Sequence, residues 1–144
     1  MRSPMNEPHE HTYFIDRNLG KSFSDALKSA GLQVERADDH FPIDTPDDVW
    51  LPEVARKNWL AVTRDARIRY SPLALAALMT SGARLFVIVG NLTAAGAADV
   101  FLRRQRKIER LAEAEKSAFI AKVRRDGVRM WQTHAEWVRH RSRT

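Results

Sequence analysis

The chain has 144 residues, which suits one hydrophobic core of ordinary size. It contains no cysteine, so disulfides, thiolate metal sites and cysteine nucleophiles are excluded, and any metal ion must be held by oxygen or imidazole ligands. The net charge is +6, and the basic excess falls within residues 103–144. This asymmetry indicates either a polyanion or acidic protein partner for the C-terminal part, or simply a solvated helix surface.

The composition is that of a folded soluble protein, with 44% hydrophobic and 29% charged residues. No apolar run approaches the roughly 20 residues that a membrane-spanning helix needs. Residues 1–11 are polar and lack the apolar stretch of a secretory signal. We therefore expect a cytoplasmic protein without membrane contact, in which residues 1–11 form a disordered tail.

The first elements alternate strand and helix. Residues 12–16 are apolar, aromatic or β-branched up to a closing acid, which predicts a buried strand ending at Asp16. Apolar positions from residue 19 to residue 30 have helical spacing, and Gly31 ends that helix. Residues 32–37 predict a second strand, and the Asp- and Pro-rich segment that follows predicts a loop.

A second helix and a third strand follow the loop. Thr45 or Asp47 can cap a helix that ends near residue 58. Residues 59–63 are apolar and β-prone, and this strand, like the first, stops just before an acid, here Asp65.

The alternation ends with a fourth strand and a longer helical region. Residues 72–79 predict a short helix that begins with proline, and residues 84–89 form an apolar run typical of a strand buried on both faces. Beyond them, residues 94–110 and 113–125 have the pattern of helices, whereas residues 127–131 fit either a late strand or a turn.

Alternating strands and helices predict an α/β fold in three layers, α/β/α, with a mostly parallel central sheet of about four strands. We expect residues 12–92 to form this core. We expect residues 93–144 to form a helical, basic C-terminal extension that packs on the core or extends it.

Several acids fall where a parallel sheet collects functional side chains. Asp16 and Asp65 lie just past the carboxyl ends of two strands, and these ends share one edge of the sheet. Asp47 or Asp48, at the start of the intervening helix, can turn toward the same crevice. Clustered carboxylates repel one another and are stable mainly when a cation neutralises them. Oxygen ligands suit Mg²⁺ or Mn²⁺, which support phosphodiester hydrolysis.

Each acid also has a purely structural interpretation. Asp16 and Asp65 are common turn residues, and Asp47 and Asp48 suit the cap and first turn of a helix. Under this alternative the chain is a non-catalytic protein whose basic C-terminal half binds RNA or a protein partner.

Three motifs carry a resemblance to a known family. They are Asp-Arg-Asn-Leu-Gly at 16–20, Pro-Asp-Asp-Val-Trp-Leu at 46–51 and Trp-Leu-Ala-Val-Thr-Arg-Asp at 59–65. In this order and spacing, residues 13 to about 89 resemble the PIN-like domains of toxin-type nucleases, especially the short group similar to VapC toxins. The resemblance implies a Mg²⁺- or Mn²⁺-dependent ribonuclease that is the toxin of a toxin-antitoxin pair. It implies that Asp16, Asp47 and Asp65 bind the metal, with Asp48 as a one-residue alternative to Asp47.

One departure from the family concerns a further acid, often Glu, that fuller PIN domains carry between the first strand and the later acids. No residue matches it clearly, and the candidates to replace it are Asp38, Asp39 and Asp44.

The polar and basic residues beside the acids are candidates for substrate binding. Asn18 is the preferred polar helper, and the candidate phosphate contacts are Arg17, Lys21, Arg67 and Arg69, for which solvated surface charge is the alternative.

Two tryptophans in the C-terminal part also suggest binding. Trp131 and Trp137 suit either base stacking or the docking of an antitoxin helix. The expected partners are therefore an RNA substrate, a cognate antitoxin protein and, as an open alternative, a second copy of the chain.

Overall fold

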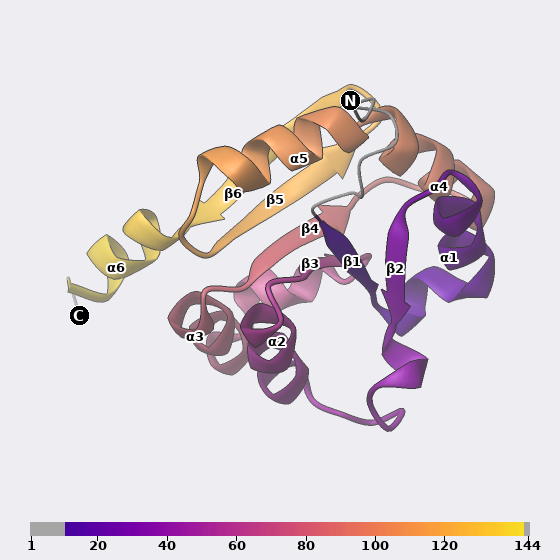
Figure 1. Cartoon of the computed structure of the whole chain (residues 1–144). Helices are drawn as coiled ribbons and strands as arrows, with labels where there is room; N and C mark the ends of the chain where they lie inside the picture. Colours follow the sequence, from indigo (N-terminus) through magenta and orange to yellow (C-terminus); the bar gives the residue numbers. More distant parts are fainter. Residues whose placement is uncertain (1–10, 143–144) are drawn as a thin grey trace, which may run out of the picture.

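The computed structural model describes residues 11–142, so the N-terminal tail expected at residues 1–11 lies almost wholly outside the described part. Within the described range, one six-stranded sheet has the order β2-β1-β3-β4-β5-β6 (Figure 1). Every neighbouring pair is parallel except β5 with β6, which is antiparallel. No helix between residues 11 and 142 combines the length and apolar character needed to cross a bilayer.

Strands and helices alternate through β4, after which two helices, a hairpin and a last helix follow. The strands are β1 (Thr12–Ile15), β2 (Gln33–Arg36), β3 (Leu60–Thr63), β4 (Arg84–Ile88), β5 (Phe119–Arg124) and β6 (Gly127–Thr133). The α-helices are α1 (Gly20–Ser29), α2 (Asp47–Arg56), α3 (Pro72–Ser81), α4 (Ala94–Arg103), α5 (Gln105–Ala114) and α6 (His134–Ser142). Short 3₁₀ helices follow three of the strands: η2 (Arg17–Leu19), η3 (Ala37–Asp39) and η4 (Ala66–Tyr70).

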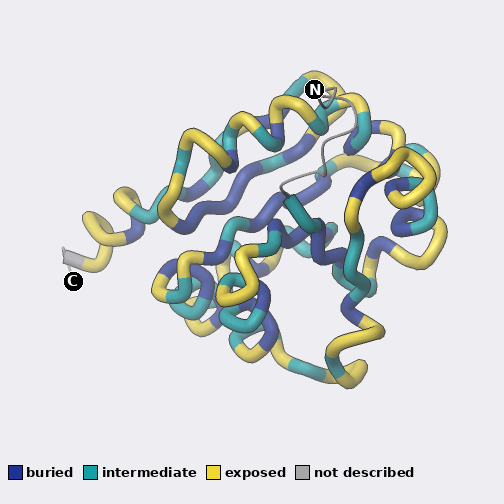
Figure 2. Tube along the Cα trace, in the orientation of Figure 1, coloured by how far each residue is buried: buried dark blue, intermediate teal, exposed yellow. Residues whose placement is uncertain are grey.

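The central strands are buried because helices cover both faces of the sheet. All four residues of β3 and the last four of β4 are buried, as expected for parallel strands between two helical layers. Side chains of α1, α4 and α5 pack in one core, and those of α2, α3 and α6 pack in the other. Figure 2 shows the buried strands running between helices that are exposed on their outer sides. The expected α/β fold with a mostly parallel sheet is therefore confirmed.

The number of strands and the helical character of the C-terminal region are corrections. The sheet has six strands rather than about four, and residues 113–125, expected to be helical, contain β5. The run Phe119–Val123 is buried except for Lys122, because β5 lies between β4 and β6 inside the sheet. Of the two options for residues 127–131, the strand is the one that forms.

The start of α2 also differs from expectation. Neither Thr45 nor Asp47 caps the helix; Pro46 occupies the cap position in an extended conformation, and Asp47 is the first helical residue. The Thr45 hydroxyl instead donates to the Pro42 carbonyl oxygen, at 2.8 Å. The Asp47 carboxylate is thus not used as a cap.

The topology brings five strand ends to one side. Because β1 to β5 are mutually parallel, their carboxyl ends share one edge of the sheet, which we call the carboxyl edge. The segments that leave β1 and β3, at Asp16 and Arg64, are neighbours along this edge.

Candidate active site

Asp16 lies at the carboxyl end of β1 and is tied to β3 through both its backbone and its side chain. Its amide donates to the Val62 carbonyl oxygen at 3.0 Å. Its Oδ1 accepts a hydrogen bond from the Arg17 amide at 2.8 Å, and its Oδ2 accepts one from the Thr63 hydroxyl at 2.7 Å. The carboxylate is therefore fixed by the ends of two adjacent strands.

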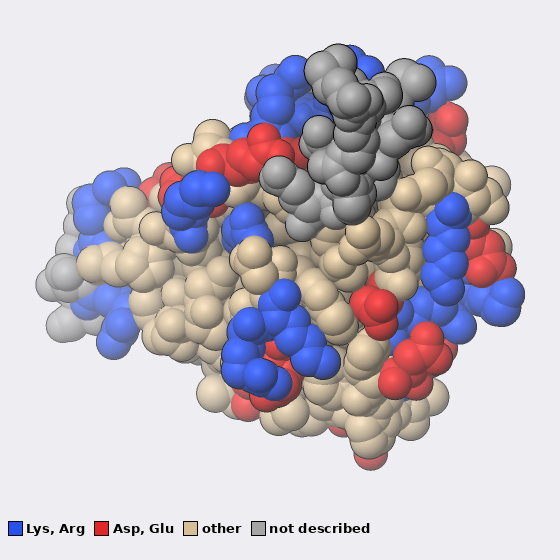
Figure 3. Space-filling view, in the orientation of Figure 1, with Lys and Arg blue, Asp and Glu red and all other residues tan. Residues whose placement is uncertain are grey.

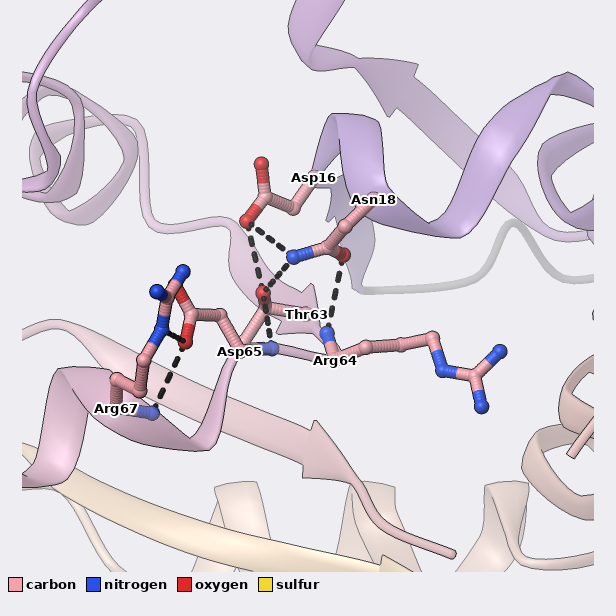
Figure 4. A network of polar contacts seen from close by, with 6 residues as sticks. All are labelled: Asp16, Asn18, Thr63, Arg64, Asp65 and Arg67. Carbon is pink, nitrogen blue, oxygen red and sulfur yellow. Dashed lines mark hydrogen bonds and ion pairs between the residues drawn. The ribbon is translucent and has the colours of Figure 1, made fainter. Parts of the chain in front are cut away.

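Thr63 is the hub of the polar network in Figure 4. Its hydroxyl is fully buried, donates to Asp16 and accepts from the Asn18 side-chain amide and the Asp65 backbone amide, both at 3.0 Å. Asn18 Nδ2 also lies 3.3 Å from Asp16 Oδ2, and Asn18 Oδ1 accepts from the Arg64 amide at 3.0 Å. Asn18 and Thr63 together hold Asp16 and the segment around Asp65 in a fixed relation.

The Asp65 carboxylate accepts hydrogen bonds from Arg67. The Arg67 side chain donates to Asp65 Oδ1 at 2.9 Å and to Oδ2 at 3.2 Å, and its backbone amide donates to Oδ1 at 3.0 Å. The hydrogen bond from the Arg67 guanidinium is the main reason why the pKa of Asp65 lies below its ordinary value. The Arg67 side chain is 90% exposed, so this ion pair stands at the surface.

Asp47 reaches the site from the first turn of α2. Its Oδ1 accepts a hydrogen bond from the Trp50 indole at 2.9 Å. Asp16, Asp47 and Asp65 line one cavity of about 230 Å³, together with Asn18 and residues of the 37–50 segment. Asp48, the alternative to Asp47, does not line this cavity.

The acids affect one another electrostatically. Burial is the main factor that raises the pKa of Asp16, and the negative charges of Asp47 and Asp65 raise it further. Hydrogen bonds from Thr63 and the Arg17 amide oppose this increase but do not cancel it. An ionised Asp16 is therefore costly unless a positive charge lies nearby.

The donor chemistry of the cavity fits Mg²⁺ or Mn²⁺, because three carboxylates supply hard oxygen ligands. Their arrangement is not that of a finished metal centre: between residues 11 and 142, no three His, Asp or Glu side chains are grouped closely enough to hold an ion. Arg67 occupies the Asp65 carboxylate through two side-chain hydrogen bonds and one backbone hydrogen bond, so a divalent cation bound by Asp65 would have to displace the guanidinium.

The three candidates for the additional family acid do not add a carboxylate to this cavity. Asp38 forms ion pairs with Arg17 at 2.5 Å and Arg36 at 3.0 Å. Asp39 and Asp44 are exposed, and neither lines the cavity. The described residues thus bring together three aspartates and no fourth acid.

The expected substrate-binding residues are divided between the cavity and the surface. Arg17 and Asn18 line the cavity, although the Arg17 guanidinium is directed to Asp38 and to the Phe41 carbonyl oxygen. Lys21 pairs with Asp25 on the exposed face of α1, at 2.7 Å.

Arg69 lies apart from the cavity. Its guanidinium lies over the rings of Tyr70 and Trp131, at 5.4 and 5.9 Å from their centroids.

Two side chains in the site received no role from the sequence. Thr63 stands two residues before Asp65 at the end of an apolar strand, and this position is the only signal for its hydroxyl. Trp50 is buried in the core, and its indole also orients Asp47 three residues earlier in α2.

Comparison with known proteins gives one match. A family model described as a PIN like domain matches residues 12–90, which is more than half of the chain. Neither the curated proteins nor the solved structures contain a significant match.

The Thr63 hydroxyl generates a first prediction. Thr63→Val keeps the shape of the side chain but leaves Asp16, Asn18 and the Asp65 amide without their shared partner, so we expect unfolding to require about 1–3 kcal/mol less free energy. Urea unfolding measures the loss, and Thr63→Ser, which keeps the hydroxyl, is the control. A valine variant as stable as the serine variant would contradict the role of the hydroxyl.

The raised pKa of Asp16 generates a second prediction. Below the pKa of the unfolded chain, Asp16 is protonated in both states and its burial costs no charge. As the pH rises from the unfolded pKa to the higher folded pKa, the unfolded chain releases its proton first, so stability falls and then levels off once native Asp16 has ionised. Asp16→Asn should therefore be more stable than the wild type at neutral pH, and this difference should vanish in acid.

Urea unfolding in EDTA across a pH series measures this difference. Asp25→Asn is the matched control. The hydrogen bond from Lys21 lowers the pKa of this exposed carboxylate, so this variant should be less stable than the wild type at neutral pH. A stability difference for Asp16→Asn that does not change with pH would show that ionisation of Asp16 is not costly.

Proposed function

Because the chain belongs to the PIN-like domain family, whose members are usually nucleases, we propose that it is a ribonuclease that uses Mg²⁺ or Mn²⁺ to hydrolyse RNA phosphodiesters. The observation that carries the proposal is the convergence of Asp16, Asp47 and Asp65 on one cavity at the carboxyl edge. These acids come from three separate segments of the chain, and neither turn formation nor helix capping requires them to share a cavity.

The three carboxylates would hold the metal ion, which when bound neutralises their repulsion and stabilises the charge on the leaving oxygen. Thr63 and Asn18 act as positioning residues, since their hydrogen bonds are made to the acids and to the backbone beside them. Arg67, once displaced from Asp65, is an exposed guanidinium at the rim of the cavity and suits a nonbridging phosphate oxygen.

The rim of the cavity also suits a nucleotide. Ile43 is 83% exposed and lines the cavity together with the half-buried Phe41. An exposed apolar side chain beside clustered charges offers a contact surface for a ribose or a base. The choice of RNA rests on the resemblance of the three motifs to toxin-type nucleases.

The same resemblance supports a role as the toxin of a toxin-antitoxin pair acting in the cytoplasm, with a cognate antitoxin as partner. A surface near α6 suits such a partner: Trp131 and Trp137 line a cavity of about 280 Å³, and the nearby Tyr70 is 70% exposed. Aromatic side chains of this kind are frequent anchors of protein interfaces.

Two observations favour a second candidate function. The Arg67–Asp65 ion pair and the lack of a finished three-acid group between residues 11 and 142 fit a PIN-like protein that binds RNA or a protein partner without cutting. The two candidates differ in their dependence on metal ions, since phosphate contacts alone respond to salt but not to EDTA.

Cleavage of a mixed RNA pool by the purified protein tests the proposal. With Mg²⁺ or Mn²⁺ we expect cleavage that EDTA abolishes, and Asp16→Asn, Asp47→Asn and Asp65→Asn should each lower the rate by about 100-fold or more, because each removes a ligand charge. Asp48→Asn is the matched control and should retain activity, since Asp48 does not line the cavity.

Cleavage that persists in EDTA or in the three variants would contradict the metal mechanism. A folded protein that cuts no RNA with either ion would favour the non-catalytic candidate.

A further inference from the structure

Two more cavities lie along the carboxyl edge, at the ends of β4 and β5. The first has a volume of about 520 Å³ and is lined by residues 89–92 and 124–126. The second has a volume of about 380 Å³ and is lined mainly by residues of α4, with Arg104 and Arg125. Arg125 lines both, so the two cavities adjoin and form one hollow, which we call the arginine groove.

Arg64 connects the arginine groove to the acid cavity. Its backbone amide donates to Asn18 Oδ1 inside the acid site. Its guanidinium points the other way and donates to the Leu92 carbonyl oxygen at 2.9 Å, with the Gly90 carbonyl oxygen at 3.4 Å. Gly90 and Leu92 both line the groove. Figure 4 shows the Arg64 side chain extending away from Asp16 and Asp65. The groove therefore begins where the acid site ends.

The groove carries an excess of positive charge. Arg103 is neutralised by Asp99, at 2.9 Å, and Asp126 offsets one further charge. Arg124 and Arg125 are exposed and form no ion pair with any residue from 11 to 142.

Arg104 strengthens the polar character of the groove. One of its terminal nitrogens donates to the Arg125 carbonyl oxygen, whereas its Nε is buried without a hydrogen-bond partner among the described residues. The guanidinium donors that the groove exposes are therefore those of Arg124 and Arg125, because the Arg104 Nε is buried.

Other basic side chains of the C-terminal part are arranged differently. In the view of Figure 3, basic side chains lie over α6, and acidic ones stand among the basic ones over α5. Basic residues on α5, such as Arg106 and Arg110, line neither cavity of the groove. The groove is distinguished by hollow shape, surplus arginines and continuity with the acid site.

We propose that the arginine groove binds phosphates of the RNA strand beside the bond that is cut, so that the strand runs along the carboxyl edge from the acid site past Arg64 to Arg124 and Arg125. Guanidinium groups suit this ligand because they bind phosphate through two parallel hydrogen bonds. Neighbouring strands lie about 4.8 Å apart, so the ends of β3 and β5 are separated by about 10 Å, which a short run of nucleotides spans. The direction of the strand toward the acids rests on the proposed function, but phosphate binding in the groove does not.

Binding of a labelled 12-nucleotide single-stranded RNA, measured by fluorescence anisotropy in EDTA at several salt concentrations, tests the groove without cleavage. The double variant Arg124→Ala/Arg125→Ala should weaken binding about tenfold or more. The slope of log affinity against log salt should fall by about 1.4, because each phosphate contact to a single strand contributes about 0.7. The control Arg106→Ala/Arg110→Ala removes the same charge from α5 and should change affinity less than about twofold.

Equal losses of RNA affinity in the two double variants would contradict phosphate binding by the groove. An unchanged affinity in Arg124→Ala/Arg125→Ala would contradict it as well. A wild-type protein that binds no RNA in EDTA would also contradict phosphate binding by the groove. The proposed nuclease activity would then be tested separately, by the cleavage experiment. In the active enzyme, the groove variant should raise KM for the 12-nucleotide RNA and leave kcat unchanged. A reduced kcat with an unchanged KM would contradict a role in substrate binding.

Discussion

The arrangement of the site depends on holding the Asp16 carboxylate at the end of β1, a buried strand inside the sheet. Burial and the nearby charges of Asp47 and Asp65 oppose its ionisation, and the Thr63 hydroxyl and the Arg17 amide compensate in part. The adjacent strands β1 and β3 supply this compensation, since Thr63 ends one and Asp16 follows the other. In the proposed function a bound cation would complete the compensation, which connects the architecture of the sheet to the nuclease chemistry proposed for this PIN-like domain.

The sequence predicted the first four strands and the helices between them because the signals there are local. Apolar runs that end at an acid, glycines after helices and a proline at the start of α3 each mark a boundary without reference to distant residues. The run Phe119–Val123 lacks such a signal, because a short apolar segment after a long helical pattern fits either structure. Only pairing with β4 on one side and β6 on the other makes it a strand.

The site could be predicted in part for the same reason. The positions of Asp16 and Asp65 follow from the rule that parallel strands share a carboxyl edge. The choice between Asp47 and Asp48 depends on where α2 begins, and the helix begins directly after Pro46, with Asp47 as its first residue. The pairing of Asp65 with Arg67, the hub role of Thr63 and the arginine groove arise from side-chain geometry across separate segments, to which sequence spacing gives no access.

The most direct test of the account is a titration of the purified protein with Mn²⁺, followed by electron paramagnetic resonance. We expect saturable binding that Asp16→Asn, Asp47→Asn and Asp65→Asn each weaken by about tenfold or more. We also expect Arg67→Ala to tighten binding, because the guanidinium competes with the ion for the Asp65 carboxylate. Absence of saturable binding, or binding that none of these substitutions alters, would contradict the claim that the three aspartates form one metal site.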